Sequence, residues 1–154
     1  MELRDVLAAI PAGVVVVAAP VEDGFRGLTA TSFIPVSLDP PLVLVSVESE
    51  TLTRQAIEHE GRFSVSLLER GQEFVAERFA GRAPAVRADW SEVPHRLSPQ
   101  GLPWITGGVA WFDCTLQSLE PAGDHALVLG AVHRAERGVG EPLVHWDRSF
   151  WRLA

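Results

Sequence analysis

The chain has 154 residues, of which 47% are hydrophobic and 21% charged, and this composition predicts one soluble globular domain spanning residues 1–154. Its formal net charge is −7 at pH 7, with 13 basic residues against 20 acidic ones. Because nucleic acids and anionic membrane surfaces bind to basic protein faces, we expect neither as a partner. The single cysteine, Cys114, excludes an internal disulfide and a cysteine-based metal site.

The N-terminal segment predicts a helix followed by a strand and not a secretion signal. It has no basic leader before its apolar stretch, which Pro11 and Gly13 interrupt. No window approaches the ~20 uninterrupted apolar residues that span a bilayer. We therefore expect a cytoplasmic protein.

The first half of the chain alternates short helices with apolar strands. Helical spacing of apolar residues predicts a helix over 2–10, which Pro11 ends. The β-branched run 14–19 predicts a strand, and the glycines in 20–27 predict a turn. Strands are expected over 28–33 and 41–47. A helix is expected over 51–60, with Ser49 or Thr51 as its cap.

The second half is dominated by strands. A strand is predicted over 63–68 and a helix over 72–80, followed by an irregular, proline-rich segment over 81–107. Strands over 108–119 and 126–135 are joined by the turn EPAGD, and 142–153 predicts one or two more. This pattern favours a mainly β, antiparallel barrel or sandwich, and it lacks a glycine-rich dinucleotide fingerprint.

A run of small and hydroxylated residues, Thr29 to Ser32, follows Gly27 in the stretch GLTATSF. Small side chains would let a flat ligand approach the backbone, and the amides and hydroxyls would bind its polar edge. On composition alone, the simpler interpretation is a strand with an exposed polar face.

The order of motifs along the chain favours the ligand-binding interpretation. GLTATSF followed by PVSLDPPLVLVSV resembles the signature of the flavin reductase-like family. RFSVSLL with Phe79-Ala80, GLPWITGGVAWFDC, AGDHALVLGAV and PLVHWDRSFWRL resemble four further segments of that family, in the same order. The resemblance implies a split β-barrel of six or seven antiparallel strands with a few short helices.

The resemblance also implies which residues lie near a flavin. It places Thr29, Ala30, Thr31 and Ser32 against the flavin ring, with Ser37 nearby. The family binds the flavin phosphate at 48–53, which here contains Glu48, Ser49, Thr51 and Thr53. A helix N-terminus there suits an anion.

Two glutamates depart from the family pattern in this segment. Glu48 stands where Asn is common and Glu50 where Ser is common. Carboxylates beside a phosphate would repel it unless they point away. Alternatively, the two negative side chains stabilise the N-terminus of the helix through its dipole.

Other motif positions carry further expectations. Ser66 replaces a frequent Asn and would keep a shorter hydrogen bond, while Phe79 belongs to the core or touches the flavin. The family's closing Tyr is absent, so Trp146 would stack on a cofactor or pack in a core or dimer interface. Arg148 would offset a phosphate charge.

His125, in the triplet GDH, is the one residue to which the resemblance assigns a catalytic position. It would position the nicotinamide or stabilise charge on the reduced flavin, while Asp124 holds the turn. The other histidines lack metal-ligand spacing, and we expect no metal site.

The resemblance predicts an NAD(P)H:flavin oxidoreductase. FMN is the preferred flavin, with FAD as the alternative, and the scarcity of basic residues favours NADH over NADPH. The reduced flavin would supply a partner monooxygenase. A homodimer is expected, with exposed Trp90 and Trp104 suited to its interface. Two alternatives stay open: a flavin carrier or sensor without reductase turnover, and an oxidase of an organic substrate that retains FMN.

Overall fold

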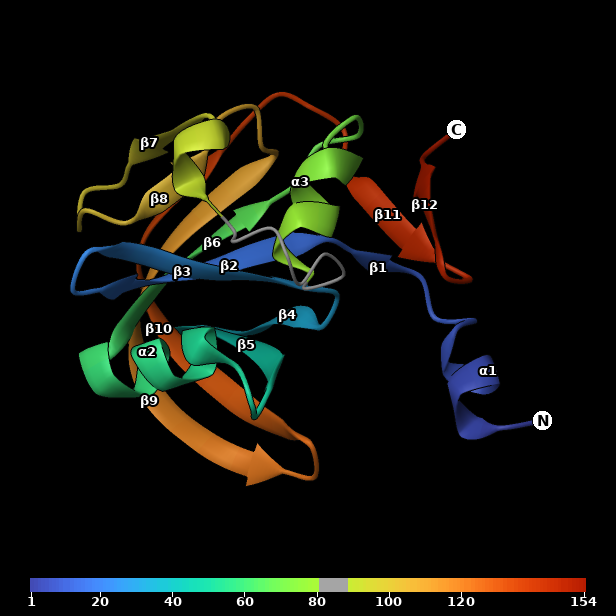
Figure 1. The fold of residues 1–154 in the computed structure, drawn as a ribbon, viewed down its shortest axis with the longest axis horizontal. Helices are drawn as coiled ribbons and strands as arrows, with labels where there is room; N and C mark the ends of the chain where they lie inside the picture. Colours follow the sequence, from blue (N-terminus) through green and yellow to red (C-terminus); the bar gives the residue numbers. More distant parts are fainter. Residues whose placement is uncertain (81–88) are drawn as a thin grey trace.

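Figure 1 shows a computed structural model of the chain, which describes residues 1–80 and 89–154. Its main feature is an antiparallel sheet of seven strands in the order β3-β2-β6-β9-β10-β5-β4. These are β2 (Val15–Val21), β3 (Gly24–Ala30), β4 (Phe33–Leu38), β5 (Pro41–Glu48), β6 (Arg62–Leu67), β9 (Ala110–Ala122) and β10 (His125–Arg137). The predicted mainly β, antiparallel fold is confirmed. No helix within the described residues is long and apolar enough to cross a membrane.

The sheet curls into a barrel, and this brings β3 close to β5 although the two strands are far apart in the strand order. Ser32 Oγ donates to the Ser46 carbonyl oxygen at 2.8 Å and accepts from the Ser46 N–H at 3.1 Å. These two bonds tie the end of β3 to β5. Inward-facing apolar residues fill the interior, and α2 (Leu52–Glu60) adds Ala56 and Ile57 to them.

A second apolar layer covers the outer face of β2. Side chains of this strand alternate between the two layers: Val15 and Val17 point into the barrel, whereas Val16 and Ala18 join the outer cluster. The outer layer comprises α3 (Glu73–Phe79), the 3₁₀ turn η1 (Trp90–Glu92) and β8 (Pro103–Ile105), which pairs with β7 (His95–Leu97). β2 is therefore buried on both faces.

The predicted exposure of Trp90 and Trp104 is wrong. Trp90 is 8% exposed and Trp104 is fully buried. Trp90 packs on Phe79 with ring centroids 4.6 Å apart, and Trp104 stacks on Trp111 at 6.2 Å. The segment expected to be irregular folds back over the sheet here, and its indoles supply apolar cover. The part of that segment at 81–88 lies outside the described residues.

Several strand boundaries also differ from the prediction. The turn expected over 20–27 is confined to Glu22 and Asp23, because Gly24–Gly27 pairs with β2 as the first half of β3. The strand expected over 28–33 ends at Ala30, and β4 was not predicted. β9 and β10 leave only Gly123 and Asp124 between them, and Gly123 adopts φ 66°, which favours glycine.

The termini form a smaller unit beside the barrel (Figure 1). A three-stranded sheet contains β1 (Ala12–Gly13), β11 (Leu143–Trp146) and β12 (Ser149–Arg152). Helix α1 (Leu3–Leu7) is shorter than predicted and has no buried residue. Polar contacts attach it: Arg148 Nη2 donates to Asp5 Oδ1 at 2.7 Å, and Trp146 Nε1 donates to the Ala9 carbonyl oxygen at 3.0 Å.

Candidate functional site

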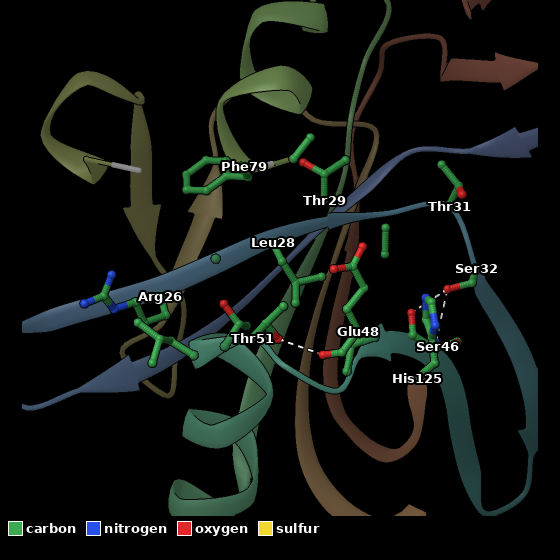
Figure 2. Close-up of a pocket in the computed structure, with 16 residues that line it drawn as sticks. Arg26, Leu28, Thr29, Thr31, Ser32, Ser46, Glu48, Thr51, Phe79 and His125 are labelled. Atoms are coloured by element: carbon green, nitrogen blue, oxygen red, sulfur yellow. Dashed lines mark hydrogen bonds between the residues drawn. The ribbon is translucent and has the colours of Figure 1, made fainter. Parts of the chain in front are cut away.

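A cavity of about 490 Å³ opens where β3, the end of β5 and the start of α2 meet (Figure 2). Its volume falls within the range of small-molecule sites in proteins. The lining residues are Arg26, Gly27, Leu28, Thr29, Ala30, Thr31, Ser32, Ser46, Val47, Glu48, Thr51, Leu52, Thr53, Phe79, Ala80 and His125. The cavity therefore gathers nine of the fourteen residues that the sequence associated with a flavin.

The wall formed by β3 is an edge of the sheet. Among the described residues, β3 pairs with β2 alone, so backbone groups along its other side are available to a ligand. Gly27 lets two aromatic rings approach this strand. A Cβ at that position would lie 2.9 Å from Trp90 Cζ2 and 3.0 Å from Phe79 Cδ1. Gly27 thereby allows Phe79 to line the cavity while being buried in the outer layer.

Two hydroxyls of this wall already serve the fold. Thr29 Oγ1 donates to the Ala76 carbonyl oxygen of α3 at 2.6 Å, and Ser32 Oγ donates to Ser46 as described above. A hydroxyl has one proton, so both groups can only accept a further hydrogen bond. The Thr31 hydroxyl makes no hydrogen bond within residues 1–80 and 89–154, and it lines the cavity. Donors to a carbonyl-bearing ligand are therefore Thr31 and the backbone amides.

The opposite wall is the turn between β5 and α2. Thr51 caps the helix, since its Oγ1 accepts from the Arg54 N–H at 3.2 Å and donates to the Glu48 carbonyl oxygen at 2.9 Å. The amides of Leu52 and Thr53 come too early in the helix to have an intrahelical acceptor. Both residues line the cavity, so this N-terminus offers N–H donors and the positive end of a helix dipole to an anion.

His125 completes the site at the first position of β10, directly opposite Glu48 of β5 in the strand register. Its Nδ1 lies 2.6 Å from Asp124 Oδ1. This hydrogen bond holds the pKa of the Asp124 carboxyl below its usual value, so the carboxylate is ionised and accepts. Nδ1 therefore carries a proton, which leaves Nε2 to face a ligand.

A second cavity, of about 570 Å³, adjoins the first. Thr29, Ala30, Thr31, Glu48 and Ala80 line both. On its far side the second cavity is lined by residues of the terminal unit and α3, namely His145, Arg148, Ser149, Phe150, Ala76 and Glu77. The two cavities offer room for two ligands side by side.

A family model described as "Flavin reductase like domain" matches residues 7–154. The chain belongs to this family. The predicted resemblance is confirmed, and it extends over nearly the whole sequence.

Relatives of similar length support the same assignment. The reductase component of 4-hydroxyphenylacetate 3-monooxygenase from Thermus thermophilus is 40% identical over 151 residues, covering 97% of this chain and 94% of that protein. An NADH-dependent flavin reductase from Rhodococcus is 36% identical over 159 residues, covering 99% and 86%. The solved structure of the NADH:FAD oxidoreductase SgcE6 from Streptomyces globisporus has a TM-score of 0.91 at 38% identity, covering 99% of this chain and 92% of that one. SgcE6 has also been solved in complex with NAD and FAD fragments.

Five residues that the flavin reductase-like motifs singled out do not line the first cavity. Ser37 lies on β4 opposite Leu42, and Ser66 is buried, with its Oγ accepting from the Ile105 N–H at 3.0 Å. Ser49 supports the turn, because its N–H donates to the Asp124 carbonyl oxygen at 3.0 Å.

The other two, Trp146 and Arg148, belong to the terminal unit. Trp146 packs edge-on against Trp151 and lines neither cavity. Arg148 lines the second cavity, with its guanidinium bonded to Asp5.

Some cavity residues were not anticipated from the flavin reductase-like motifs. Arg26 was assigned to a turn, although it lies on β3 and lines the cavity. Its alternation with Leu28 and Ala30 along one strand was the signal that could have placed it. Ser46 and Leu52 also line the cavity. They do so because β5 and α2 pack next to β3 in the folded chain.

The described residues fit a flavin. The β3 wall offers small side chains, edge-strand amides and the Thr31 hydroxyl to a planar ring with carbonyls. The α2 N-terminus offers amides to a phosphate. Glu48 is the one carboxylate lining the first cavity among the described residues, and it opposes that phosphate.

Proposed function

We propose that this protein is an NADH-dependent flavin reductase whose flavin lies in the cavity between β3, β5 and α2. The observation that carries the proposal is that one cavity joins an edge strand with available backbone amides to a helix N-terminus. A flavin bound there would supply the ring that accepts a hydride from a reduced nicotinamide. The protein itself has to bind, orient and shield the two ligands.

The two walls would hold different parts of the flavin. Amides of β3 and the Thr31 hydroxyl would bind the ring, and Ala30 leaves room for it. Amides of Leu52 and Thr53 would bind the phosphate. FMN is the first choice and FAD the second, because the described residues of the cavity offer one helix N-terminus, which suits one phosphate.

The adjoining cavity would receive the nicotinamide. His125 lines the first cavity and not the second, so its Nε2 would orient the nicotinamide where that ring extends over the flavin, while Nδ1 is engaged by Asp124. NADH is favoured over NADPH because the charged residues lining the second cavity are Glu48, Glu77 and Arg148, and Arg148 is paired with Asp5. A ribose 2′-phosphate would meet more negative than positive charge there.

The biological setting is proposed from the relatives. One of the relatives above is named as an NADH-dependent flavin reductase, one as an NADH:FAD oxidoreductase and one as the reductase component of a monooxygenase. We therefore infer that the reduced flavin leaves this protein to serve a partner monooxygenase. We also infer one domain over residues 1–154, a homodimer and a cytoplasmic location.

The test is the rate of NADH oxidation by desalted protein, with and without added FMN. A rate that requires FMN and saturates with it supports a reductase that uses flavin as a substrate. The same assay with FAD and with NADPH ranks the ligands. No oxidation of either nucleotide with either flavin, by protein that binds FMN, overturns the proposal.

A flavin carrier or sensor is the second candidate, and Glu48 favours it. An acidic group in the cavity and the absence of the family's closing tyrosine both depart from the reductase pattern. A protein that stays yellow through desalting and does not oxidise NADH would support this candidate. A yellow protein that oxidises an organic substrate with oxygen would support the FMN-dependent oxidase instead.

A further inference from the structure

The structure separates the two glutamates that depart from the family pattern. Glu48 lines both cavities, and Figure 2 shows its side chain extending from β5 toward β3. Glu50 lies two residues later and lines neither cavity, although both glutamates are exposed. The two residues therefore have different access to a ligand although both are acidic and nearly adjacent.

The charge of Glu48 is not neutralised by the described part of the chain. Glu58 pairs with Arg54, Asp5 with Arg148 and Asp124 with His125. The Glu48 carboxylate makes no ion pair or hydrogen bond with residues 1–80 or 89–154. The bond from the Thr51 hydroxyl goes to the backbone carbonyl oxygen of Glu48 and not to its side chain. Its side-chain oxygens are therefore available as acceptors toward a ligand in the cavity.

We propose that Glu48 is a specificity-determining residue that weakens the binding of phosphate-bearing flavins relative to riboflavin, which makes the bound flavin exchangeable. The proposal rests on the flavin site proposed above. A sphere of 490 Å³ is roughly 10 Å across, comparable with the Debye length at physiological salt, so a carboxylate and a phosphate in this cavity are not fully screened from each other. A phosphate monoester carries about −1.5 to −2 charges at pH 7, whereas riboflavin carries none.

The competing attraction comes from the α2 N-terminus and from Arg26, which lines the same cavity. Two amides and a helix dipole favour the phosphate, and they act within the first turn of the helix. Glu48 opposes them from the end of β5, three residues before the cap. The net effect is a site that recognises the ring and ribityl chain and gains little from the phosphate. Such a site suits a flavin that enters, is reduced and leaves.

The experiment compares dissociation constants for riboflavin and FMN, measured by quenching of flavin fluorescence at physiological salt. Wild type, Glu48→Gln and Glu50→Gln are compared. Both substitutions change the net charge by the same amount, and Glu48→Gln leaves the bond from Thr51 to the backbone intact. Glu48→Gln is expected to tighten FMN binding roughly threefold to tenfold and to change riboflavin binding by less than about twofold. Glu50→Gln is expected to change both by less than about twofold.

Three outcomes would overturn the proposal. If Glu48→Gln changes FMN and riboflavin binding by the same factor, Glu48 acts on the ring or ribityl chain and not on the phosphate. If Glu50→Gln tightens FMN as much as Glu48→Gln does, net charge alone explains the effect. If wild type binds neither flavin, the proposed function itself fails, which is distinguishable because no ratio can then be measured.

Discussion

The two walls of the cavity use their polar groups in different ways. On β3 and just after it, the hydroxyls of Thr29 and Ser32 donate to backbone carbonyls of α3 and β5, so they hold the wall in place. On the β5–α2 turn, Thr51 also serves the fold, but the carboxylate of Glu48 and the first amides of α2 are left for a ligand. The first wall is fixed by internal bonds and carries one charged side chain, Arg26, whereas the second carries the Glu48 carboxylate beside the positive end of a helix. The ring of a ligand would therefore be held mainly by hydrogen bonds and packing, and its anionic end mainly by electrostatic interactions.

Gly27→Ala tests whether close packing fixes the β3 wall, and we expect the largest effect here. The added Cβ would overlap Trp90 and Phe79, so one ring or the strand has to move. Unfolding free energy should fall by about 1–3 kcal/mol, and flavin affinity should fall with it. Thermal melting and flavin titration measure both. Gly13→Ala is the matched control, because its Cβ would meet only the end of the Leu67 side chain at 3.3 Å. Equal effects of the two variants would contradict the role of Gly27.

His125→Ala tests the opposite side of the cavity. The rate of NADH oxidation should fall about tenfold or more, because the nicotinamide loses the group that orients it. Flavin binding should change by less than about threefold, since the flavin is held by the other walls. Stopped-flow reduction and fluorescence titration separate the two. A larger loss in flavin affinity than in rate would show that His125 holds the flavin instead.

Thr29→Val and Thr31→Val compare a hydroxyl on β3 that serves the fold with a hydroxyl just after β3 that is left for a ligand. Thr29→Val removes the donor to the buried Ala76 carbonyl oxygen and should reduce the unfolding free energy by about 1 kcal/mol. Thr31→Val should change it by less than about 0.5 kcal/mol and instead weaken flavin binding. Chemical denaturation and flavin titration of both variants give the comparison. The idea fails if the two substitutions have the same profile.

Asp124→Asn should give the smallest effect, and it depends on pH. The hydrogen bond from His125 lowers the pKa of the Asp124 carboxyl from its ordinary 3.8, so this contact contributes stability above that value. The contribution is lost as pH falls through the lower pKa of the folded state. The melting temperatures of wild type and Asp124→Asn should therefore differ slightly near neutral pH and converge below about pH 3.8. A difference in melting temperature that persists well below that pH would contradict this assignment.

The sequence predicted those parts of the molecule whose structure is encoded locally. Runs of apolar residues placed β2, β5 and β6, and the motif order placed the cavity residues Thr29 to Ser32 and His125. Contacts between distant segments were not predictable in this way. The bond from Thr29 to α3 and the burial of Trp90 depend on how the outer layer docks on the sheet. The role of Ser66 also depends on such a contact, because its hydroxyl accepts a hydrogen bond from Ile105 of β8 and does not line the cavity.

The open edge of β3 has a consequence for the behaviour of the protein in storage. A strand whose outer backbone groups are unpaired can recruit a strand from another molecule, which is a common route to aggregation. Among the described residues, the cavity lies along this edge. A flavin seated there would cover the edge as well as stabilise the fold by mass action. Preparations kept with excess flavin should therefore stay in solution longer than preparations stripped of it.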